Sequence, residues 1–413
     1  MKPGLERIRA LLALMGDPQR GYPSIHIAGS NGKTTTARLA AGLLAAHGLN
    51  PGLFTSPHLQ TVEERFEVGG EPMAPEDLGP VLEEVLPFAA ALEERTGDGI
   101  TYFELTAAAA FAWFAARAVD AAVVEVGLGG RLDATNVLDA AVAVITSISL
   151  EHTEYLGDTT AAIAAEKAAI LAPGRTLVTG RLPAEALEVA GARAAATGSA
   201  WLCWDRDFSV AEARPAVGGW LADLEGVYRA YPGIRLPLHG RHQMVNLAVA
   251  VAAVEAFFGR ALDPQAVAEA AAAARSPGRM EVVRRDPLVL LDGAHNPEGT
   301  GALAAALAEE FPTRRWAVVF GAMADKDVPA MLRLLAPAAA GFHTARAAGS
   351  SRARPSGEVA ALASGETPVP VTEHETVAEA VAAALAGDDP VLVTGSLYVV
   401  GEARTALGLG PGG

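Results

Sequence analysis

The stretch IHIAGSNGKTTTARLAAGLLAAHG, residues 25–48, decides the fold of this protein. It begins with the short apolar run of a buried strand, passes through a loop with two glycines, and continues as an amphipathic helix expected over 35–47. Glycines in such a loop let backbone N–H groups turn toward an anion, and the helix N-terminus adds a positive dipole. The stretch therefore predicts an α/β fold with a phosphate-binding loop.

The spacing within the loop indicates the role of each side chain. The loop reads G-x-x-G-K-T from Gly29 and is shorter than the full Walker pattern, because Ile27 stands where that pattern has its first glycine. Lys33 can reach terminal phosphates, and the hydroxyl of Thr34 or Thr35 can bind Mg²⁺. The alternative is a turn with chance glycines, which the flanking strand and helix disfavour.

The chain continues to alternate between strand-like and helix-like segments. The runs AAVVEVGLGG (121–130) and AAVAVITSISL (140–150) are typical of buried parallel strands. Helical patterns precede them at 75–95 and 105–119. This βαβ order predicts a doubly wound, mainly parallel sheet.

The pattern changes in the second half of the chain. Residues 201–238 are short alternating runs with Gly and Pro between them, which predicts a small antiparallel sheet. A helix is expected over 242–258, and the segment ARSPGRM at 274–280 has the residues of a linker. A second α/β alternation follows, so we expect two domains, residues 1–275 and 276–413.

Composition excludes several classes of function. The chain has 413 residues, 51% of them hydrophobic, but its longest apolar runs are too short for a membrane helix, and no signal peptide is apparent. The net charge of −16 argues against general nucleic-acid binding. The single cysteine, Cys203, fits a reducing cytoplasm. We therefore expect a cytoplasmic protein whose partners are small molecules rather than nucleic acids or membranes.

Polar side chains follow three of the expected strands. Ser56 and His58 follow one, Glu125 lies in an otherwise apolar strand, and His152 follows another. Ligands bind outside the carboxyl ends of the strands in an open α/β sheet, so these groups can converge with the loop threonines on one Mg²⁺. For His152 taken alone, a helix-start or loop histidine without a ligand is the favoured interpretation.

One lysine lies on an apolar helical stripe. Lys167 follows Ile163 at i+4, and Ile170 completes the stripe. Lysine is rare in this chain, which contains only Lys2, Lys33, Lys167 and Lys326. A cation on an apolar face is costly unless it has a use. The alternative is a side chain that reaches solvent beside Glu166.

Taken in order, the motifs resemble the folylpolyglutamate synthase/dihydrofolate synthase family, which is similar to the Mur ligases. They cover nearly the whole chain and comprise HIAGSNGKTT (26–35), SPHL (56–59) with ER (64–65), TYFELT (101–106), EVGLGGRLDATN (125–136), ITSISLEHTEYLGDT (145–159), EKAAI (166–170), GRHQMVNLAVA (240–250), GRMEVV (278–283), LDGAHNP (291–297), DKD (325–327) and TGSLYVVG (394–401). The resemblance implies an N-terminal P-loop ATPase domain and a smaller C-terminal Rossmann-like domain, with ATP in the cleft between them.

The resemblance also implies roles for individual residues. The expected ATP contacts are Gly29, Ser30, Asn31, Gly32, Lys33, Thr34, Thr35, Asn246, Arg279 and Asp292. The expected Mg²⁺ ligands are Thr34 or Thr35, Ser56, Glu125 and His152, with a second Mg²⁺ on Lys167 after its carbamylation by CO₂. The expected substrate contacts are Thr101, Tyr102, Phe103, Glu104, Leu132, Asp133, Ala134, Ser396 and Tyr398, and the catalytic groups are Lys33, Lys167 and His295.

The carbamate explains why lysine is required at this position. Only a primary amine that can lose its proton forms a carbamate, an apolar environment favours that loss, and arginine stays protonated. Two positions depart from the family pattern: threonines follow Lys33 where glycine and serine are usual, and Glu151 replaces an aspartate.

The implied reaction joins L-glutamate to a folate-type carboxylate through an acyl phosphate made from ATP. The protein is expected to be a monomer. Three readings compete: this ligase, a Mur-type amino-acid ligase on another carboxylate, and a nucleotide-binding protein without activity. A Mur enzyme has a further N-terminal domain, for which the 28 residues before Gly29 leave no room. The sequence leaves open whether dihydropteroate, tetrahydrofolate or both are substrates.

Overall fold

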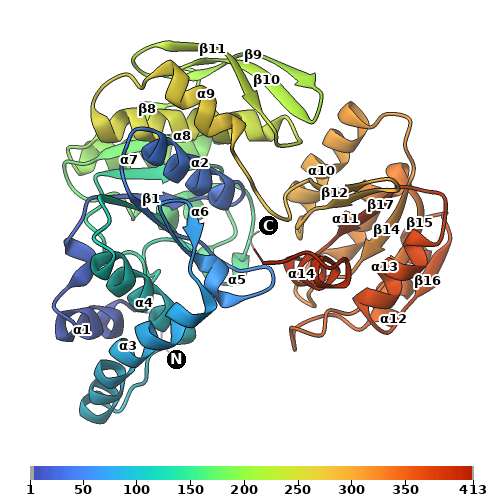
Figure 1. The fold of residues 1–413 in the computed structure, drawn as a ribbon, viewed down its shortest axis with the longest axis horizontal. Coiled ribbons are helices and arrows are strands. Elements are labelled where there is room, and N and C mark those ends of the chain that lie inside the picture. Colours follow the sequence, from blue (N-terminus) through green and yellow to red (C-terminus); the bar gives the residue numbers. More distant parts are fainter. Residues whose placement is uncertain (1–3, 412–413) are drawn as a thin grey trace.

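The protein contains two α/β units and a small antiparallel sheet, seen in a computed structural model that describes residues 4–411 (Figure 1). The first sheet has eight strands in the order β4 (Glu71–Pro72), β3 (Phe66–Val68), β2 (Pro51–Phe54), β5 (Ala121–Glu125), β1 (Ser24–Ala28), β6 (Val142–Ile145), β7 (Thr176–Thr179) and β8 (Ala200–Cys203). Its strands are parallel from β2 to β8, and β3 and β4 pair antiparallel at one edge.

Helices cover both faces of this sheet, as a doubly wound fold requires. Alternate residues of a strand point to opposite faces, and Ile25 and Ile27 of β1 accordingly pack in one core cluster while Ala28 packs in another. The helices of this half are α1 (Glu6–Leu14), α2 (Lys33–Ala46), α3 (Pro75–Thr96), α4 (Tyr102–Ala116), α5 (Thr153–Leu156), α6 (Thr160–Ala168), α7 (Ala184–Ala196), α8 (His242–Phe258) and α9 (Pro264–Ala272).

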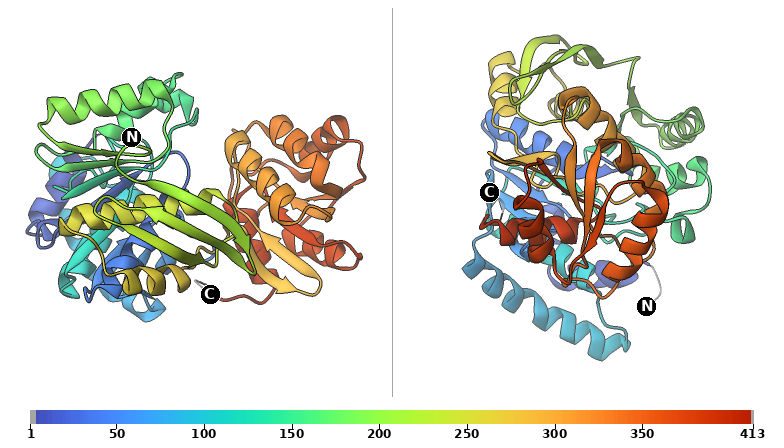
Figure 2. Two further views of the ribbon diagram at one scale, coloured as in Figure 1. Left: turned by 90° about the horizontal axis from the view of Figure 1, so that it is seen from above. Right: turned by 90° about the vertical axis from the view of Figure 1, so that its right-hand side faces the viewer.

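A small antiparallel sheet extends this half of the molecule. It consists of β9 (Ser209–Ala216), β10 (Gly219–Glu225) and β11 (Ala230–Leu236), and it packs on α8 and α9. Seen from above, its strands reach toward the C-terminal half (Figure 2, left). The antiparallel sheet was expected to begin at residue 201, and this was wrong, because residues 201–203 extend β8 of the parallel sheet.

The C-terminal half forms a third sheet after a connecting segment at 273–280. Its strand order is β12 (Glu281–Arg285), β13 (Leu288–Leu291), β17 (Val391–Thr394), β14 (Trp316–Phe320), β15 (Ala339–Thr344) and β16 (Val371–Glu373). Its helices are α10 (Pro297–Glu310), α11 (Val328–Leu335), α12 (Ser356–Glu366), α13 (Val377–Leu385) and α14 (Leu397–Ala406). The edge strands β12 and β16 were not expected, because both are only partly buried and lack the continuous apolar run of the central strands.

One local prediction needs correction and one is confirmed. The helix expected from residue 105 begins at Tyr102, because Thr101 and Glu104 form a capping box that starts it earlier. Glu125 lies in the apolar strand β5 as expected, and as its last residue it places its carboxylate at the carboxyl end of the sheet.

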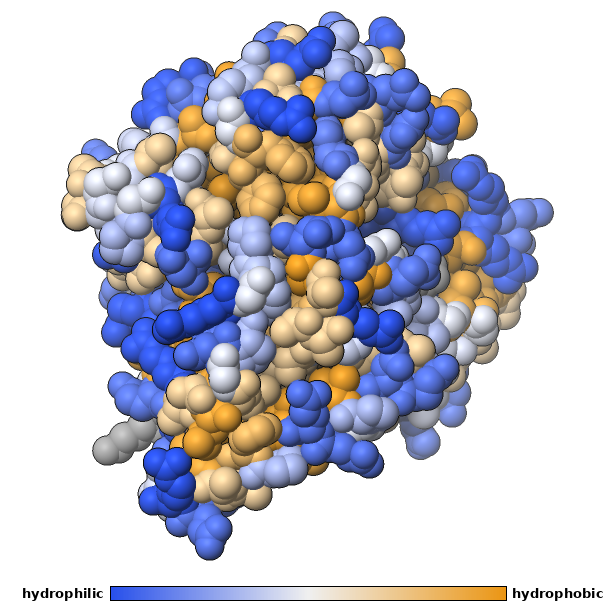
Figure 3. All heavy atoms as spheres, turned by 60° about the vertical axis from the view of Figure 1, so that its left-hand side comes forward, coloured by the Kyte–Doolittle hydropathy of each residue, from blue (hydrophilic) through white to orange (hydrophobic). Residues whose placement is uncertain are grey.

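The molecular surface carries both hydrophobic and hydrophilic areas. On the face shown in Figure 3, hydrophobic residues form areas separated by hydrophilic side chains. Within residues 4–411, no helix is long and apolar enough to cross a membrane.

Candidate functional site

The loop between β1 and α2 needs glycine at two positions. Gly29 has φ of 156°, and a Cβ there would lie 1.9 Å from Oγ1 of Thr146. Gly32 has φ of 85°, and a Cβ there would lie 2.4 Å from Oδ1 of Asn246. Any side chain would clash, so both glycines are required by the backbone path. Gly32 is also the N-cap of α2 and has no side chain to occupy the first N–H groups of the helix, which remain available for an anion.

The side chain of Lys33 folds back over this loop and bonds its carbonyl groups. Its Nζ donates to the carbonyl oxygen of Gly29 at 2.7 Å and to that of Ser30 at 3.2 Å. Ser30 in turn donates its backbone N–H to Ser147 at 2.9 Å, and Oγ1 of Thr146 donates to the carbonyl of Asn31 at 2.6 Å. The chain after β6 thus fixes the loop, and the loop carbonyl groups hold the Lys33 ammonium.

Glu125 is the buried acid at the carboxyl end of β5. Its side chain is 1% exposed, Oε1 accepts from Oγ1 of Thr34 at 3.0 Å, and Oε2 accepts from the N–H of Ser56 at 3.2 Å. Burial raises the pKa of Glu125, while Lys33 and Arg279 oppose that rise. Carboxylate and hydroxyl oxygens beside a phosphate loop fit Mg²⁺.

The two loop threonines point to different partners. Oγ1 of Thr34 meets Glu125, whereas Oγ1 of Thr35 lies 2.8 Å from Oγ of Ser276 in the connecting segment. This geometry favours Thr34 as the metal ligand. Within residues 4–411, no three His, Cys, Asp or Glu side chains are grouped to hold a metal, so a metal here would depend on hydroxyl oxygens and on the substrate.

His152 lies in a strained turn close to the same region. It has φ of 44° and is the N-cap of α5. Burial lowers its pKa, and Lys326 lowers it further, against the opposite effect of Glu151. A largely neutral imidazole is the form that binds metals, but the contribution of His152 stays a prediction.

Lys167 is buried, not solvated. It is 2% exposed, and its Nζ lies 2.9 Å from Oε1 of Glu151 and donates to the carbonyl oxygen of Gly29 at 3.0 Å. Glu166 pairs with Arg131 at 2.8 Å, so the expected alternative of a lysine reaching solvent beside Glu166 was wrong. Burial and Lys33 lower the pKa of Lys167 to about 8, against the opposing effect of Glu151.

The expected nucleotide contacts from the C-terminal half gather around Gly293. A Cβ on Gly293 would lie 2.5 Å from Nη1 of Arg279. The Asp292 carboxylate accepts from the N–H of Met280 at 2.9 Å and from that of Ala294 at 2.8 Å, and burial raises its pKa. These two hydrogen bonds fix the position of the Asp292 carboxylate at the start of the C-terminal half. Each carboxylate oxygen still has a lone pair that could accept from a ligand.

His295 follows on the same segment. Its Nδ1 lies 2.8 Å from the carbonyl oxygen of Gly293, and burial lowers its pKa to about 4. A carbonyl can only accept, so Nδ1 carries the proton and Nε2 is left with a lone pair. Arg279, Lys326 and Lys33 are the positive charges that lower this pKa further.

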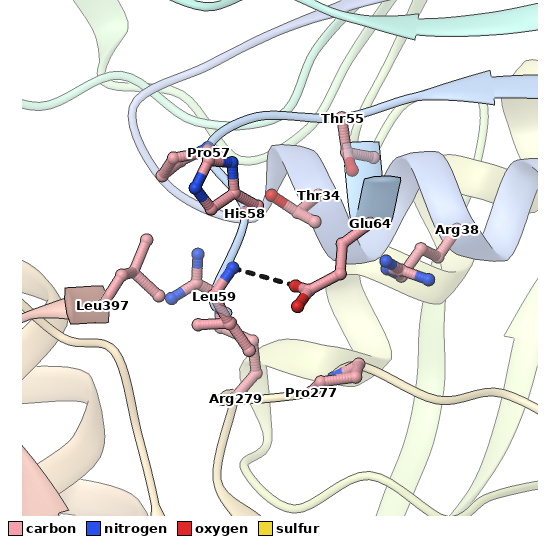
Figure 4. A pocket seen from close by; sticks show the side chains of 10 residues that line it. All are labelled: Thr34, Arg38, Thr55, Pro57, His58, Leu59, Glu64, Pro277, Arg279 and Leu397. Carbon is pink, nitrogen blue, oxygen red and sulfur yellow. Dashed lines mark hydrogen bonds between the residues drawn. The ribbon is translucent and has the colours of Figure 1, made fainter. Parts of the chain in front are cut away.

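A pocket joins the two halves of the molecule at this site (Figure 4). The phosphate-loop half contributes Thr34 and His58, and the C-terminal half contributes Arg279 and Leu397. The pocket is lined by Thr34, Arg38, Thr55, Pro57, His58, Leu59, Glu64, Pro277, Arg279 and Leu397. A ligand here would touch both halves at once.

Two of the expected substrate residues already have structural partners. Thr101 N–H donates to Oε2 of Glu104 at 2.7 Å, and Glu104 N–H donates to Oγ1 of Thr101 at 3.1 Å. Arg7 pairs with the Glu104 carboxylate at 3.2 Å. Capping of α4 accounts for both residues, so a substrate contact by either stays a prediction.

The neighbouring residues form a partly apolar surface. Tyr102 is 56% exposed, with the Arg65 guanidinium 5.5 Å from its ring centroid. The Phe103 ring fills the space beside Gly127, where a Cβ would lie 2.5 Å from it. Leu128 and Leu132 are also exposed. The segments at 101–104 and 127–134 therefore lie side by side and present aromatic and aliphatic groups.

The remaining expected contacts are held by local hydrogen bonds. The buried Asp133 carboxylate accepts from the N–H groups of Leu128 at 2.9 Å and Thr135 at 3.0 Å, next to buried Ala134. Ser396 caps α14 by accepting from the N–H of Tyr398 at 3.2 Å. For Asp133, Ala134 and Ser396 the structure thus provides a local role.

Two charged residues of the site, Glu151 and Lys326, have no role assigned from the sequence. Glu151 pairs with Lys167, and Lys33 and Lys167 overcome the effect of its burial to lower its pKa to about 2. Lys326 comes from the C-terminal half and lies close enough to affect His152 and His295. Two features of the sequence point to Lys326: it is one of only four lysines, and it lies in the DKD motif at 325–327.

Comparisons with known proteins agree with this arrangement. Residues 27–180 match the Mur ligase middle domain, and residues 278–397 match the Mur ligase, glutamate ligase domain. The dihydrofolate synthase/folylpolyglutamate synthase of Mycobacterium tuberculosis is 42% identical over 99% of this chain and 91% of its own length.

Solved structures give the same result. Mycobacterium tuberculosis folylpolyglutamate synthase complexed with ADP and AMPPCP superposes with a TM-score of 0.95 at 41% identity, covering 99% of this chain and 96% of that chain. An FPGS–AMPPCP–folate complex superposes with a TM-score of 0.86 at 35% identity, covering 97% and 94%. The fold, the paired domain matches and the identity over the full length show that this chain belongs to the folylpolyglutamate synthase/dihydrofolate synthase family of Mur ligase-related enzymes.

Proposed function

We propose that this protein is an ATP-dependent ligase that adds L-glutamate to a folate-type substrate, tetrahydrofolate polyglutamate, dihydropteroate or both. The observation that carries this proposal is the pocket in which Thr34 of the phosphate loop faces Arg279 of the other half. Thr34 also donates to the buried Glu125 carboxylate, and both Lys33 and Arg279 act on the pKa of that carboxylate. Relatives with the family names above bind an ATP analogue and folate.

We propose that residues 1–275 act as the ATP-binding domain and 276–413 as the glutamate-ligase domain. The γ-phosphate would lie between Lys33 and Arg279, with Asn246 and Asp292 toward the nucleoside. Support comes from Asn246, whose Oδ1 lies beside Gly32 of the loop, and from Asp292, which directly follows β13 and accepts from the N–H of Met280 at 2.9 Å. Closure of the two domains would exclude water from the reacting groups.

For the metal, we propose a Mg²⁺ held by Thr34 and Glu125, with Ser56 and His152 close by. When bound, Mg²⁺ neutralises phosphate charge as the phosphoryl group moves. The buried Glu125 carboxylate accepts from the Thr34 hydroxyl and from the backbone N–H of Ser56, and this supports the placement.

For Lys167, we propose carbamylation by CO₂ and a second Mg²⁺. The neutral amine attacks the CO₂ carbon, an N–C bond forms, and one proton leaves to solvent, so the product is a carbamate anion. A pKa of about 8 supports this step, because a useful fraction of the amine is then unprotonated near neutral pH. The competing explanation is that the Lys167–Glu151 pair only supports Gly29.

The proposed reaction has two steps. A substrate carboxylate oxygen attacks the γ-phosphorus of ATP, ADP leaves, and an acyl phosphate forms; the glutamate amine then attacks the acyl carbon and inorganic phosphate leaves. Lys33 and Arg279 position the phosphoryl group and balance its charge. Nε2 of His295 has the free lone pair that can take the amine proton.

For the substrate, we propose that the pterin lies against the aromatic and aliphatic surface at 101–104 and 127–134. Exposed Tyr102, Leu128 and Leu132 support this placement, since exposed apolar side chains gathered at a cleft are typical of a ligand site. Ser396 and Tyr398 would lie toward the incoming glutamate. We further propose a cytoplasmic monomer that binds neither nucleic acid nor membranes, consistent with its charge of −16 and single cysteine.

The proposal is tested by phosphate release from ATP and Mg²⁺ with dihydropteroate or tetrahydrofolate, each with and without L-glutamate. Glutamate-dependent release with at least one pterin is expected. Absence of such release with both pterins, in a protein that binds ATP, would overturn it and leave a Mur-type ligase on another carboxylate as the next candidate.

A further inference from the structure

Glu310, the last residue of α10, reaches from the C-terminal half into the other half of the protein. Its Oε1 accepts from Nε1 of Trp220 at 3.0 Å and from the N–H of Gly240 at 2.5 Å. Its Oε2 lies 2.6 Å from Nδ1 of His239. One carboxylate thus joins α10 to strand β10 and to the segment between β11 and α8.

This contact is buried. The Glu310 side chain is 5% exposed, Trp220 is fully buried in the core between α8 and the small sheet, and the His239 ring lies 5.6 Å from the ring of Phe311. A buried carboxylate is costly unless it is hydrogen-bonded, and three donors from the facing half satisfy this one. The site is therefore built around Glu310 and is more than a surface contact between two domains.

The opposite end of α10 contacts the phosphate loop. Nδ2 of Asn31 donates to Oε2 of Glu298, and Asn296 caps the helix by accepting from the N–H of Gly299 at 2.7 Å. The helix has 14 residues, so its two contacts with the first half lie about 20 Å apart. Figure 1 shows α10 on the side of the C-terminal half that faces the small sheet.

We propose that Glu310 is a positioning residue: it anchors the far end of α10, so that Glu298 at the near end stays in contact with Asn31 of the phosphate loop. Two attachments along one rigid helix fix its direction, whereas one attachment allows it to turn. Without Glu310 the C-terminal half keeps the Asn31–Glu298 contact and the bonds of Gln60 with Arg404 and Leu409, both at 2.9 Å, but the far end of α10 loses its buried attachment to the other half. This inference rests on the proposed function for its kinetic test.

The test compares Glu310→Ala, Glu310→Gln and Trp220→Phe with Glu309→Gln. Glu309 is exposed, precedes Glu310 on the same helix, and so serves as the control for charge alone. The kcat/KM for ATP is expected to fall on the order of tenfold in Glu310→Ala, and to stay within twofold in Glu309→Gln. Glu310→Gln keeps an oxygen that can accept from Trp220 and Gly240, so it is expected to recover part of the loss.

A second readout separates positioning from stability. Binding of AMPPCP is followed by tryptophan fluorescence, and thermal unfolding is measured for each variant. The proposal predicts weaker AMPPCP binding in Glu310→Ala at a temperature well below its unfolding transition. It is overturned if Glu310→Ala unfolds at a lower temperature but binds AMPPCP and turns over ATP like the wild type, because the contact would then serve stability alone.

Failure of the proposed function would look different. In that case the wild type and Glu309→Gln would both lack glutamate-dependent turnover, while the AMPPCP titration would still compare Glu310→Ala with wild type. Weaker binding in that titration would support the positioning role, and equal binding would overturn it.

Discussion

Nζ of Lys167 lies 2.9 Å from the Glu151 carboxylate and 3.0 Å from the carbonyl oxygen of Gly29. This buried lysine therefore touches both the phosphate loop and the acid that follows β6. The pair places an amine with a pKa of about 8 next to the proposed phosphate site, a position where either an ammonium or a carbamate would act directly on the reaction.

Replacement of Lys167 distinguishes these two forms. Lys167→Arg keeps the positive charge but cannot form a carbamate, so we expect activity to fall on the order of a hundredfold. Added carbon-13 bicarbonate should give a carbamate signal in wild-type protein that is missing in the variant. Wild-type activity in Lys167→Arg would exclude the carbamate.

The two loop threonines offer a matched pair of variants. Thr34→Ala removes a hydroxyl 3.0 Å from Glu125, so the Mg²⁺ concentration for half-maximal activity should rise on the order of tenfold. Thr35→Ala removes a bond to Ser276, so it should lower stability by about 1 kcal/mol with an unchanged Mg²⁺ requirement. Activity titrated with MgCl₂ and thermal unfolding provide both measurements, and the reverse pattern would assign the metal to Thr35.

A buried histidine makes stability depend on pH. His26 is fully buried, and burial lowers its pKa to about 3; its Nε2 lies 2.8 Å from Oγ1 of Thr135, which itself donates to Asp133. The folded protein keeps His26 neutral while the unfolded chain protonates it near pH 6.5. Stability from this group is therefore complete above pH 6.5 and falls by about 1.4 kcal/mol per unit as pH drops toward the folded pKa.

The measurement is the thermal midpoint between pH 7.5 and 5 for wild type and His26→Gln, which keeps a donor but does not titrate. The variant should lose less stability than wild type over this range. Parallel curves for the two proteins would show that His26 does not contribute.

The cap of α4 separates a structural from a substrate role for Thr101. Thr101→Ala should lower stability by about 1 kcal/mol because the N–H of Glu104 loses its acceptor, and Thr101→Ser should restore it. Thermal unfolding and the KM for each pterin are measured together. A raised KM with unchanged stability would instead favour a direct substrate contact.

Much of this architecture follows from local pattern. The limits of α8 agree with the expected 242–258, because its long apolar run ends at Gly259, which takes the left-handed backbone conformation of a helix C-terminus. The short edge strands β12 and β16 were missed, since their pairing depends on neighbours far along the chain. The start of α4 was missed because its capping box lay within a motif read as substrate contacts.

The site was partly predictable for a similar reason. The backbone requirement at Gly29 and Gly32 and the burial of Glu125 follow from residue type and position. The Lys167–Glu151 pair and the Glu310–Trp220 contact join residues 16 and 90 positions apart, so only the folded chain reveals them.

The central claim is that the substrate carboxylate is phosphorylated before glutamate is joined to it. It is tested most directly with a pterin substrate whose reacting carboxylate carries oxygen-18, incubated with ATP, Mg²⁺ and L-glutamate. Mass spectrometry should find the glutamylated product and one oxygen-18 atom in the released phosphate. Glutamylated product with only unlabelled phosphate would contradict the acyl phosphate, and the absence of any glutamylated product would contradict the ligase itself.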